Sequence, residues 1–177
     1  MKKIIVGILI VVVAAVAVTL ILAATKPDTF TVRRSATVNA KPDRIAEQII
    51  DFRKWAAWSP YEKYDPAMKR TFSGPGKGTG AVYEWKGNSD IGSGRMKILE
   101  VTPDRISIQL DFFEPMEGHN TAEFIFEPEG SSTRVTWDMH GPTSFIGKIF
   151  HVFINMDTMV GKDFEAGLQN LKAVAEK

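Results

Sequence analysis

The feature that most constrains this chain is an uncharged run of 21 residues from Ile4 to Ala24. As an α-helix rising about 1.5 Å per residue, the run would reach roughly 31 Å, which is the thickness of the hydrocarbon core of a bilayer. Residues 4–24 are therefore predicted to form a transmembrane helix that follows a short N-terminal tail of residues 1–3.

The charges that flank this run predict its orientation. Lys2 and Lys3 precede it, which favours a cytoplasmic N-terminus and a globular domain on the extracytoplasmic side, although basic residues at 26, 33 and 34 follow on the other side. The alternative is a cleaved secretory signal, whose apolar region usually has about 7 to 15 residues and ends in a small-x-small site. The run is longer than that, and its end, Ile21-Leu-Ala-Ala24, fits such a site poorly. A retained single-pass anchor is favoured, and both interpretations place the domain on the same side.

The remaining chain has the composition of one folded domain. Residues 25–28 are predicted to be a linker and residues 29–177 a single domain, which is long enough to bury a core without disulfides. The 22 Lys and Arg residues, less Lys2 and Lys3, leave 20 basic side chains against 21 acidic ones. A near-neutral domain without a basic block is not expected to bind nucleic acid. Cysteine is absent, which excludes disulfides, thiolate nucleophiles and thiolate metal sites.

Hydrophobic periodicity predicts the elements of this domain. Alternation over Thr29–Val38 predicts a strand, and helical spacing after Pro42 predicts a helix over Pro42–Asp51 and a shorter one over Phe52–Trp58. Apolar residues three or four apart after Pro142 predict one long C-terminal helix. Between these helices, short alternating segments separated by turn residues predict strands near residues 68–73, 80–86, 93–101, 105–113, 119–127 and 132–140.

This order of elements predicts an α+β fold in which an antiparallel sheet of about seven strands packs against the final helix. A helix with an apolar stripe must bury it against another layer. We expect a strongly twisted sheet around one long helix to leave space between the two, and that space is the candidate site.

Several segments resemble one known superfamily in their order along the chain. They are Ala40-Lys-Pro-Asp-Arg-Ile45, Trp55-Ala-Ala-Trp58-Ser-Pro-Tyr61, Gly78-Thr-Gly-Ala-Val-Tyr-Glu-Trp85, Thr133-Arg-Val-Thr-Trp137 and Phe164-Glu-Ala-Gly-Leu-Gln-Asn-Leu-Lys172. Together they resemble the START-like, or SRPBCC, superfamily, in particular its polyketide cyclase/dehydrase and lipid-transport branch. The resemblance implies a helix-grip fold, a curved antiparallel sheet wrapped around a long C-terminal helix with two short helices after the first strand. It also implies apolar or amphipathic ligands held between sheet and helix. The N-terminal anchor is a departure from the soluble members.

Strand alternation predicts which side chains would line that space. Tyr83 and Trp85 share one face of their strand, opposite Glu84, and the aromatic face should point inward. Phe153, Met156 and Val160 are expected to face the sheet from the helix. The predicted ligand-binding set is Trp55, Trp58, Tyr61, Tyr83, Trp85, Ile108, Leu110, Phe112, Phe124, Trp137, Phe153, Met156 and Val160. The alternative is that these residues form ordinary packed core. Likewise, Trp55, Trp58 and Tyr61 would either form a rim over the cavity or plug the end of the sheet.

The segment Phe145–Met156 is apolar nearly all round, which a helix buried on one side does not require. Its outer residues, Phe145, Ile146, Phe150 and Ile154, are predicted to be exposed, where they would face the bilayer or gate a portal for lipid. The alternative is that the loop containing Phe113, Pro115 and Met116 covers them.

No catalytic residue, metal or cofactor is predicted. Gly74-Pro-Gly-Lys-Gly-Thr-Gly80 lacks the first glycine of a phosphate-binding loop, and the three histidines are widely spaced. If the aromatic rows point inward, the titratable groups on those strands point outward: Glu84, Asp111, Asp138 and His140. His119, Glu114 and Glu117 are expected in a solvated loop.

Three functions fit these predictions. The first is binding or transport of a hydrophobic or amphipathic, lipid-like small molecule at a membrane surface. The second is a cyclase or aromatase that uses the same cavity, which would need a titratable group pointing inward. The third is an interaction or stress-related module that binds no ligand.

Overall fold

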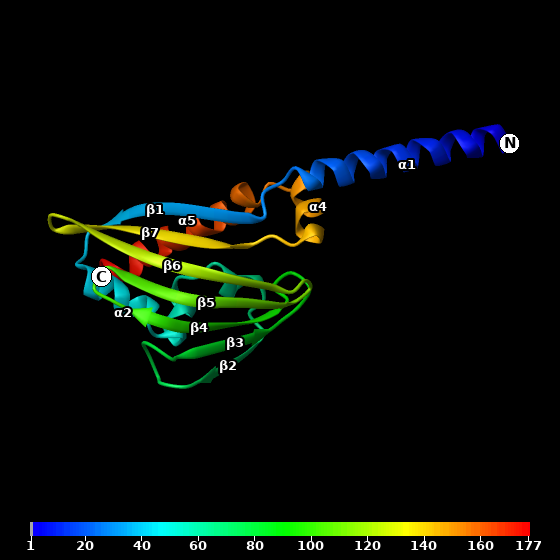
Figure 1. Cartoon of the computed structure of the whole chain (residues 1–177). Helices are drawn as coiled ribbons and strands as arrows, with labels where there is room; N and C mark the ends of the chain where they lie inside the picture. The colour runs from blue at the N-terminus through cyan, green and yellow to red at the C-terminus, as the bar shows by residue number, and fades with distance from the viewer. Residues whose placement is uncertain (1) are drawn as a thin grey trace.

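A computed structural model describes residues 2–177. Helix α1 (Lys2–Ala24) projects from the domain as a separate rod (Figure 1). Its residues Lys3–Ala24 have a mean hydropathy of 3.3, and the helix is long and apolar enough to span a membrane. Its last residues contact helix α4 (Phe145–Phe153), where Ala23 is fully buried.

The domain is built on one antiparallel sheet of seven strands, as predicted, and their order is β1-β7-β6-β5-β4-β3-β2 (Figure 1). The first strand, β1, forms one edge of the sheet and pairs with the last strand, β7. The strands are β1 (Thr29–Val38), β2 (Lys69–Ser73), β3 (Val82–Lys86), β4 (Ser93–Val101), β5 (Arg105–Glu114), β6 (Gly118–Glu129) and β7 (Ser132–Pro142).

Helices cover one face of this sheet. The predicted pair after β1 is present as α2 (Pro42–Ile49) and the 3₁₀-helix η1 (Phe52–Ala57). A further single turn, α3 (Tyr61–Tyr64), was not predicted. The long helix α5 (Met156–Ala175) packs on β1 and β7, which is the arrangement expected of the helix-grip fold.

The prediction of one continuous C-terminal helix was wrong, because the chain breaks between α4 and α5. Ile154 is extended, with φ −121° and ψ 128°, and the Asn155 side chain accepts a hydrogen bond from the backbone N–H of Thr158 at 3.0 Å. An asparagine that caps a new helix competes with continuation of the old one. Phe153 is consequently 72% exposed, so the expectation that it faces the sheet was also wrong.

Aromatic rings join α5 to the sheet. The rings of Trp137 on β7 and Phe164 on α5 are stacked, with centroids 4.0 Å apart and planes 4° apart. The ring of Phe124, the partner of Trp137 on β6, also stacks on Trp137, with centroids 5.0 Å apart and planes 29° apart. Each such ring buries about 150–250 Å² of surface, so this column supplies a large share of the apolar contact between the two layers.

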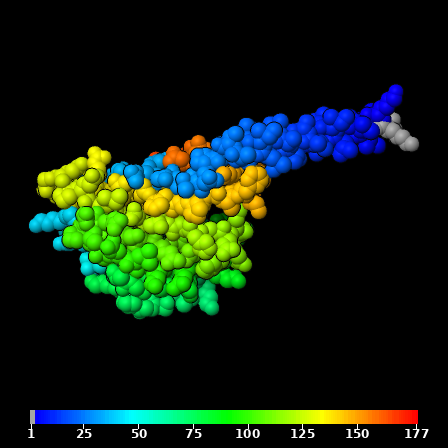
Figure 2. Space-filling view, in the orientation of Figure 1, coloured from blue at the N-terminus to red at the C-terminus, as the bar shows by residue number. Residues whose placement is uncertain are grey.

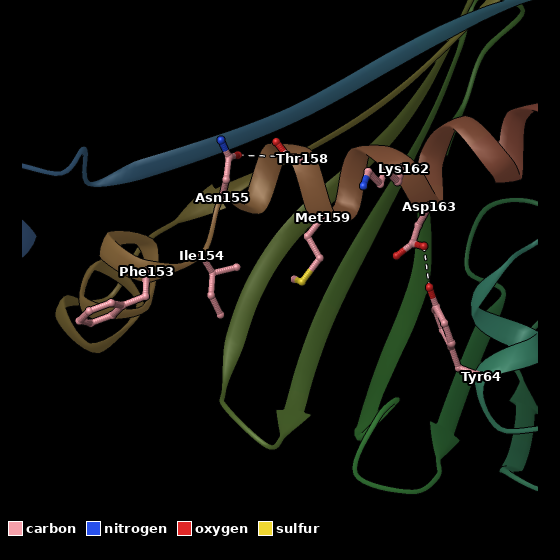
Figure 3. Close-up of a pocket in the computed structure, with 8 residues that line it drawn as sticks. All are labelled: Tyr64, Phe153, Ile154, Asn155, Thr158, Met159, Lys162 and Asp163. Atoms are coloured by element: carbon pink, nitrogen blue, oxygen red, sulfur yellow. Dashed lines mark hydrogen bonds between the residues drawn. The ribbon is translucent and has the colours of Figure 1, made fainter.

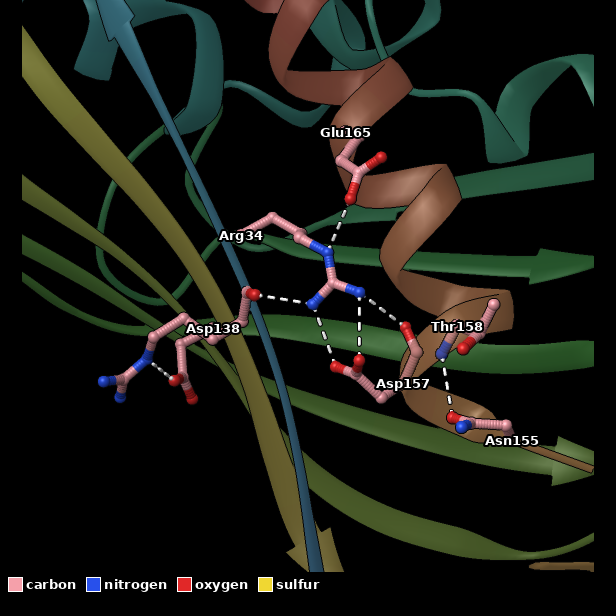
Figure 4. A network of polar contacts seen from close by, with 7 residues as sticks. Arg34, Asp138, Asn155, Asp157, Thr158 and Glu165 are labelled. Atoms are coloured by element: carbon pink, nitrogen blue, oxygen red, sulfur yellow. Dashed lines mark hydrogen bonds and ion pairs between the residues drawn. The ribbon is translucent and has the colours of Figure 1, made fainter.

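An ion pair holds the start of α5 against β1. Arg34, on the inner face of β1, donates to Glu165 Oε1 at 2.7 Å and to both carboxylate oxygens of Asp157 at 2.9 and 3.1 Å (Figure 4). It also donates to the backbone carbonyl of Asp157 at 2.8 Å. Gly161 leaves the room this guanidinium needs, since a Cβ there would lie 2.0 Å from a nitrogen of Arg34.

The close approach of α5 to the ring of Trp137 gives a testable prediction. A Cβ at Gly167 would lie 2.7 Å from that ring, so Gly167→Ala should lower the free energy of unfolding by about 1–3 kcal/mol despite the better helix propensity of alanine. Thermal unfolding of the full chain in detergent micelles, followed by near-ultraviolet circular dichroism, measures this.

Gly147→Ala in α4 is the matched control, because its nearest neighbour would be a Thr143 side-chain carbon at 3.2 Å. It should unfold closer to the wild-type temperature than Gly167→Ala does, because a side-chain carbon has less far to move than the Trp137 ring. Equal stability of the two variants would contradict the packing described for Trp137.

Candidate ligand-binding site

Most of the predicted ligand-binding residues lie inside the domain. Nine are buried, namely Trp55, Trp58, Tyr83, Trp85, Ile108, Leu110, Phe124, Trp137 and Val160. Tyr61, Phe112 and Met156 are partly buried, and Phe153 alone is exposed.

The buried aromatic members pack on one another rather than around an opening. Trp55 and Trp58 have ring centroids 4.6 Å apart, and the Trp58 centroid lies 5.6 Å from that of Trp137. Hydrogen bonds also fix both indoles, since Trp55 donates to the carbonyl of Ile49 at 2.9 Å and Trp58, which follows η1, donates to the carbonyl of Gln48 at 3.0 Å. The rings therefore fill the space between the sheet and the middle of α5.

An open hollow of about 590 Å³ lies at the junction of α4 and α5 (Figure 3). Its apolar part is formed by Phe153, Ile154 and Met159, which are 72%, 41% and 51% exposed. Only Phe153 belongs to the set predicted from the sequence. The lining is completed by Tyr64, Asn155, Thr158, Lys162 and Asp163.

One hydrogen bond closes the far side of this hollow. The hydroxyl of Tyr64 on α3 donates to Asp163 Oδ1 on α5 at 2.6 Å, which links two elements 99 residues apart (Figure 3). The bond to this carboxylate raises the pKa of Tyr64 to about 12. Lys162 is exposed and forms no ion pair within residues 2–177. An apolar floor with a cation and a hydroxyl at its rim can hold an amphipathic molecule.

Sequence patterns indicated little about these polar residues. Tyr64 lies in a helical turn that was not predicted, and Asp163 meets it only through tertiary packing. Asn155 was the one sequence signal for the helix break, because asparagine is a preferred N-cap residue and so indicates the start of a new helix.

A titratable group that does point inward is Glu62, which was also missed. Its Oε1 accepts a hydrogen bond from the Tyr83 hydroxyl at 2.6 Å and its Oε2 accepts one from Arg70 Nε at 2.7 Å. Burial and this carboxylate together raise the pKa of Tyr83. These two hydrogen bonds tie α3 to β2 and β3.

A second hollow of about 470 Å³ lies where β1, β6 and β7 meet, and His119 and His140 are among the residues that line it. The Nδ1 atom of each histidine lies 2.9 Å from a buried aspartate, Asp111 for His119 and Asp138 for His140. These residues lie opposite the inward rows, as predicted for Asp111, Asp138 and His140, whereas His119 lies in β6 rather than in a loop. Among residues 2–177 there is no group of three or more His, Asp or Glu side chains that could hold a metal.

Two histidines, His119 and His151, are predicted to have pKa values shifted in opposite directions. The hydrogen bond to Asp111 raises the pKa of His119 above 6.5, whereas burial, and then the nearby Lys26, lowers the pKa of His151. Because the folded-state pKa of His119 is the higher one, its contribution to stability is present below the unfolded value and is lost as the pH rises through the folded value. Nuclear magnetic resonance titration of the imidazole signals measures both.

Asp111→Asn is the test of cause. It should return the pKa of His119 toward 6.5 and leave His151 unchanged. A single pKa shared by both histidines in the wild type would show that these environments are described wrongly.

Comparison with known proteins places this geometry in a family. The family model described as polyketide cyclase/dehydrase and lipid transport matches residues 29–176. No curated protein sequence matches the chain significantly.

Solved structures share the fold at low identity. The Zhui aromatase/cyclase from Streptomyces sp. R1128 has a TM-score of 0.61 at 16% identity, over 84% of this chain and 94% of that one. The Aha1 dimer from Colwellia psychrerythraea has a TM-score of 0.56 at 16% identity, over 83% of this chain and 96% of that one. Major latex-like protein 151 from Panax ginseng has a TM-score of 0.56 at 10% identity, over 85% of this chain and 100% of that one.

Such different proteins share an architecture and not one activity, so the structural likeness shows the fold alone. The family model covers most of the chain, from the first strand to the end of α5. The chain therefore belongs to the polyketide cyclase/dehydrase and lipid transport family.

Proposed function

We propose that this domain binds an apolar or amphipathic, lipid-like small molecule in the hollow at the α4–α5 junction, and that α1 keeps it beside a membrane. The observation that carries the proposal is the exposed apolar lining of that hollow, Phe153, Ile154 and Met159, next to the end of a helix able to span a bilayer. Membership of a family described by lipid transport supports the same ligand class.

The size and chemistry of the hollow suit such a ligand. Its volume of about 590 Å³ falls within the range of about 300–1,000 Å³ that is usual for small-molecule sites. Each methylene group that a ligand buries against the apolar side chains contributes about 0.8 kcal/mol. Lys162 at the rim offers a charged partner to an anionic head group, and Tyr64 offers its hydroxyl oxygen.

The packed interior sets how deep the ligand lies. The rings of Trp55, Trp58 and Trp137 occupy the space between the sheet and α5, so the ligand contacts the outer end of the predicted lining first. Phe153 is the predicted residue that it would touch in the conformation described.

In this proposal α1 stays in the membrane and keeps the binding site close to the lipid. A domain fixed to a bilayer meets lipid at a high effective concentration, because ligand and site share one surface. Modest affinity in an open hollow is then sufficient for exchange with the bilayer.

The test is native mass spectrometry of the full chain released from detergent micelles. Wild-type protein is expected to retain an adduct of lipid mass. Met159→Trp fills the hollow without entering the core, since Met159 is 51% exposed, and it should lower the fraction of protein that carries the adduct to the level that α1 alone retains.

Leu99→Trp is the control, because Leu99 is 46% exposed on β4 and lies outside the hollow. It should keep the adduct, including any lipid that α1 retains. The absence of an adduct from the wild type, or an adduct that Met159→Trp leaves intact, would contradict binding at this site.

A further inference from the structure

Exposed apolar side chains of the domain gather at the end from which α1 emerges. We call this surface the apolar end and define it by Phe113 and Met116 of the β5–β6 hairpin and by Phe145, Ile146 and Phe150 of α4, which are 42–61% exposed. Exposure of the α4 residues confirms the prediction from the sequence, and the hairpin residues do not cover them. We infer that the apolar end rests in the interface of the same bilayer that α1 spans, with α4 lying in the plane of the membrane surface.

The connection to α1 brings α4 to the membrane. Four residues separate the end of α1 from the start of β1, a link of at most about 14 Å, so the domain cannot move far from the bilayer. The link is also tied to α4: Lys148 forms an ion pair with Asp28, and the Thr143 N–H donates to the carbonyl of Asp28 at 2.7 Å. Helix α4 itself contacts the last turns of α1 (Figure 1).

Strand register places the hairpin at the same end. Thr29, the first residue of β1, pairs with Pro142, the last of β7, and β7 leads directly into α4. On β6, Thr121 pairs with His140, so the β5–β6 hairpin lies beside the end of β7. Figure 2 shows α4 below the end of α1, on the side of the molecule that α1 leaves.

The shape and chemistry of α4 fit an interfacial helix. Gly147 is buried, Lys148 and His151 are partly buried toward the linker and β1, and the outer side chains are large and apolar. Helices that lie in a membrane interface place such a face roughly 5–10 Å into the boundary between head groups and acyl chains. Contiguous apolar surface on a domain already held at a bilayer has lipid as its nearest partner.

This orientation deepens the proposed function. It rests on the proposed retention of α1 in the membrane, but it does not require that the hollow bind a ligand. Phe153 and Ile154 continue the apolar end into the hollow, so a lipid could pass from the bilayer to Met159 without crossing water.

The absence of cysteine makes a direct test available, because each introduced cysteine can carry the only spin label. The full-chain variants Met116→Cys, Ile146→Cys and Phe150→Cys, each spin-labelled in phosphatidylcholine nanodiscs, are compared by electron paramagnetic resonance. Oxygen should reach these labels severalfold better than a water-soluble nickel chelate does, since oxygen concentrates in hydrocarbon. Labels at Leu99 and Val101, exposed at the opposite end of β4, are the control and should favour the chelate.

Two results would overturn the inference. If labels at residues 146 and 150 respond like those at 99 and 101, the apolar end faces water. If they are immobilised and shielded from both reagents, the end is covered by protein, for example a second copy of the chain. Neither result bears on ligand binding in the hollow, which the lipid-adduct experiment tests independently.

Discussion

The stack of Trp137 on Phe164 is the contact on which the rest of this domain depends. It fixes α5 at van der Waals distance from β7, and the surrounding indoles of Trp55 and Trp58 then have only the remaining space to fill. Gly167 permits this approach because a Cβ at that position would lie only 2.7 Å from the Trp137 ring. Once the middle of the layer is closed in this way, the open space is displaced toward the N-terminal end of α5.

The break in the helix before α5 creates the open hollow at this end of the domain. Had the helix continued through Ile154, Phe153 would follow the stripe that packs on the sheet. Instead Asn155 begins a new helix, α4 turns away, and the two helices leave a hollow with an apolar lining between them. The same break leaves the outer face of α4 without a protein partner among residues 2–177, at the end of the domain nearest α1. A single capping side chain thus connects local structure to the proposed lipid site and to the proposed membrane contact.

Periodicity alone predicted the strands, the two helices after β1 and the burial of most aromatic residues, because each depends on local alternation. The exposure of Phe145, Ile146 and Phe150 was also predictable, since a helix that is apolar all round cannot bury every side chain on one neighbour. The helix break was missed because apolar residues continue at helical spacing across it, and the spacing outweighed the cap. The pairing of Tyr64 with Asp163 could not be predicted, because sequence patterns do not carry contacts between residues 99 positions apart. The resemblance to the START-like superfamily predicted the fold correctly, but it could not tell how completely rings fill the interior.

Hydrogen–deuterium exchange of the full chain in nanodiscs, with and without added oleic acid, tests most directly whether the binding space lies at the mouth of the domain rather than in its interior. Binding at the α4–α5 junction predicts slower exchange on addition of oleic acid within residues 145–163. Exchange should be unchanged in η1 and in β7, where the rings already pack on one another. Slower exchange centred on Trp55, Trp58 and Trp137, with none at the junction, would contradict this assignment.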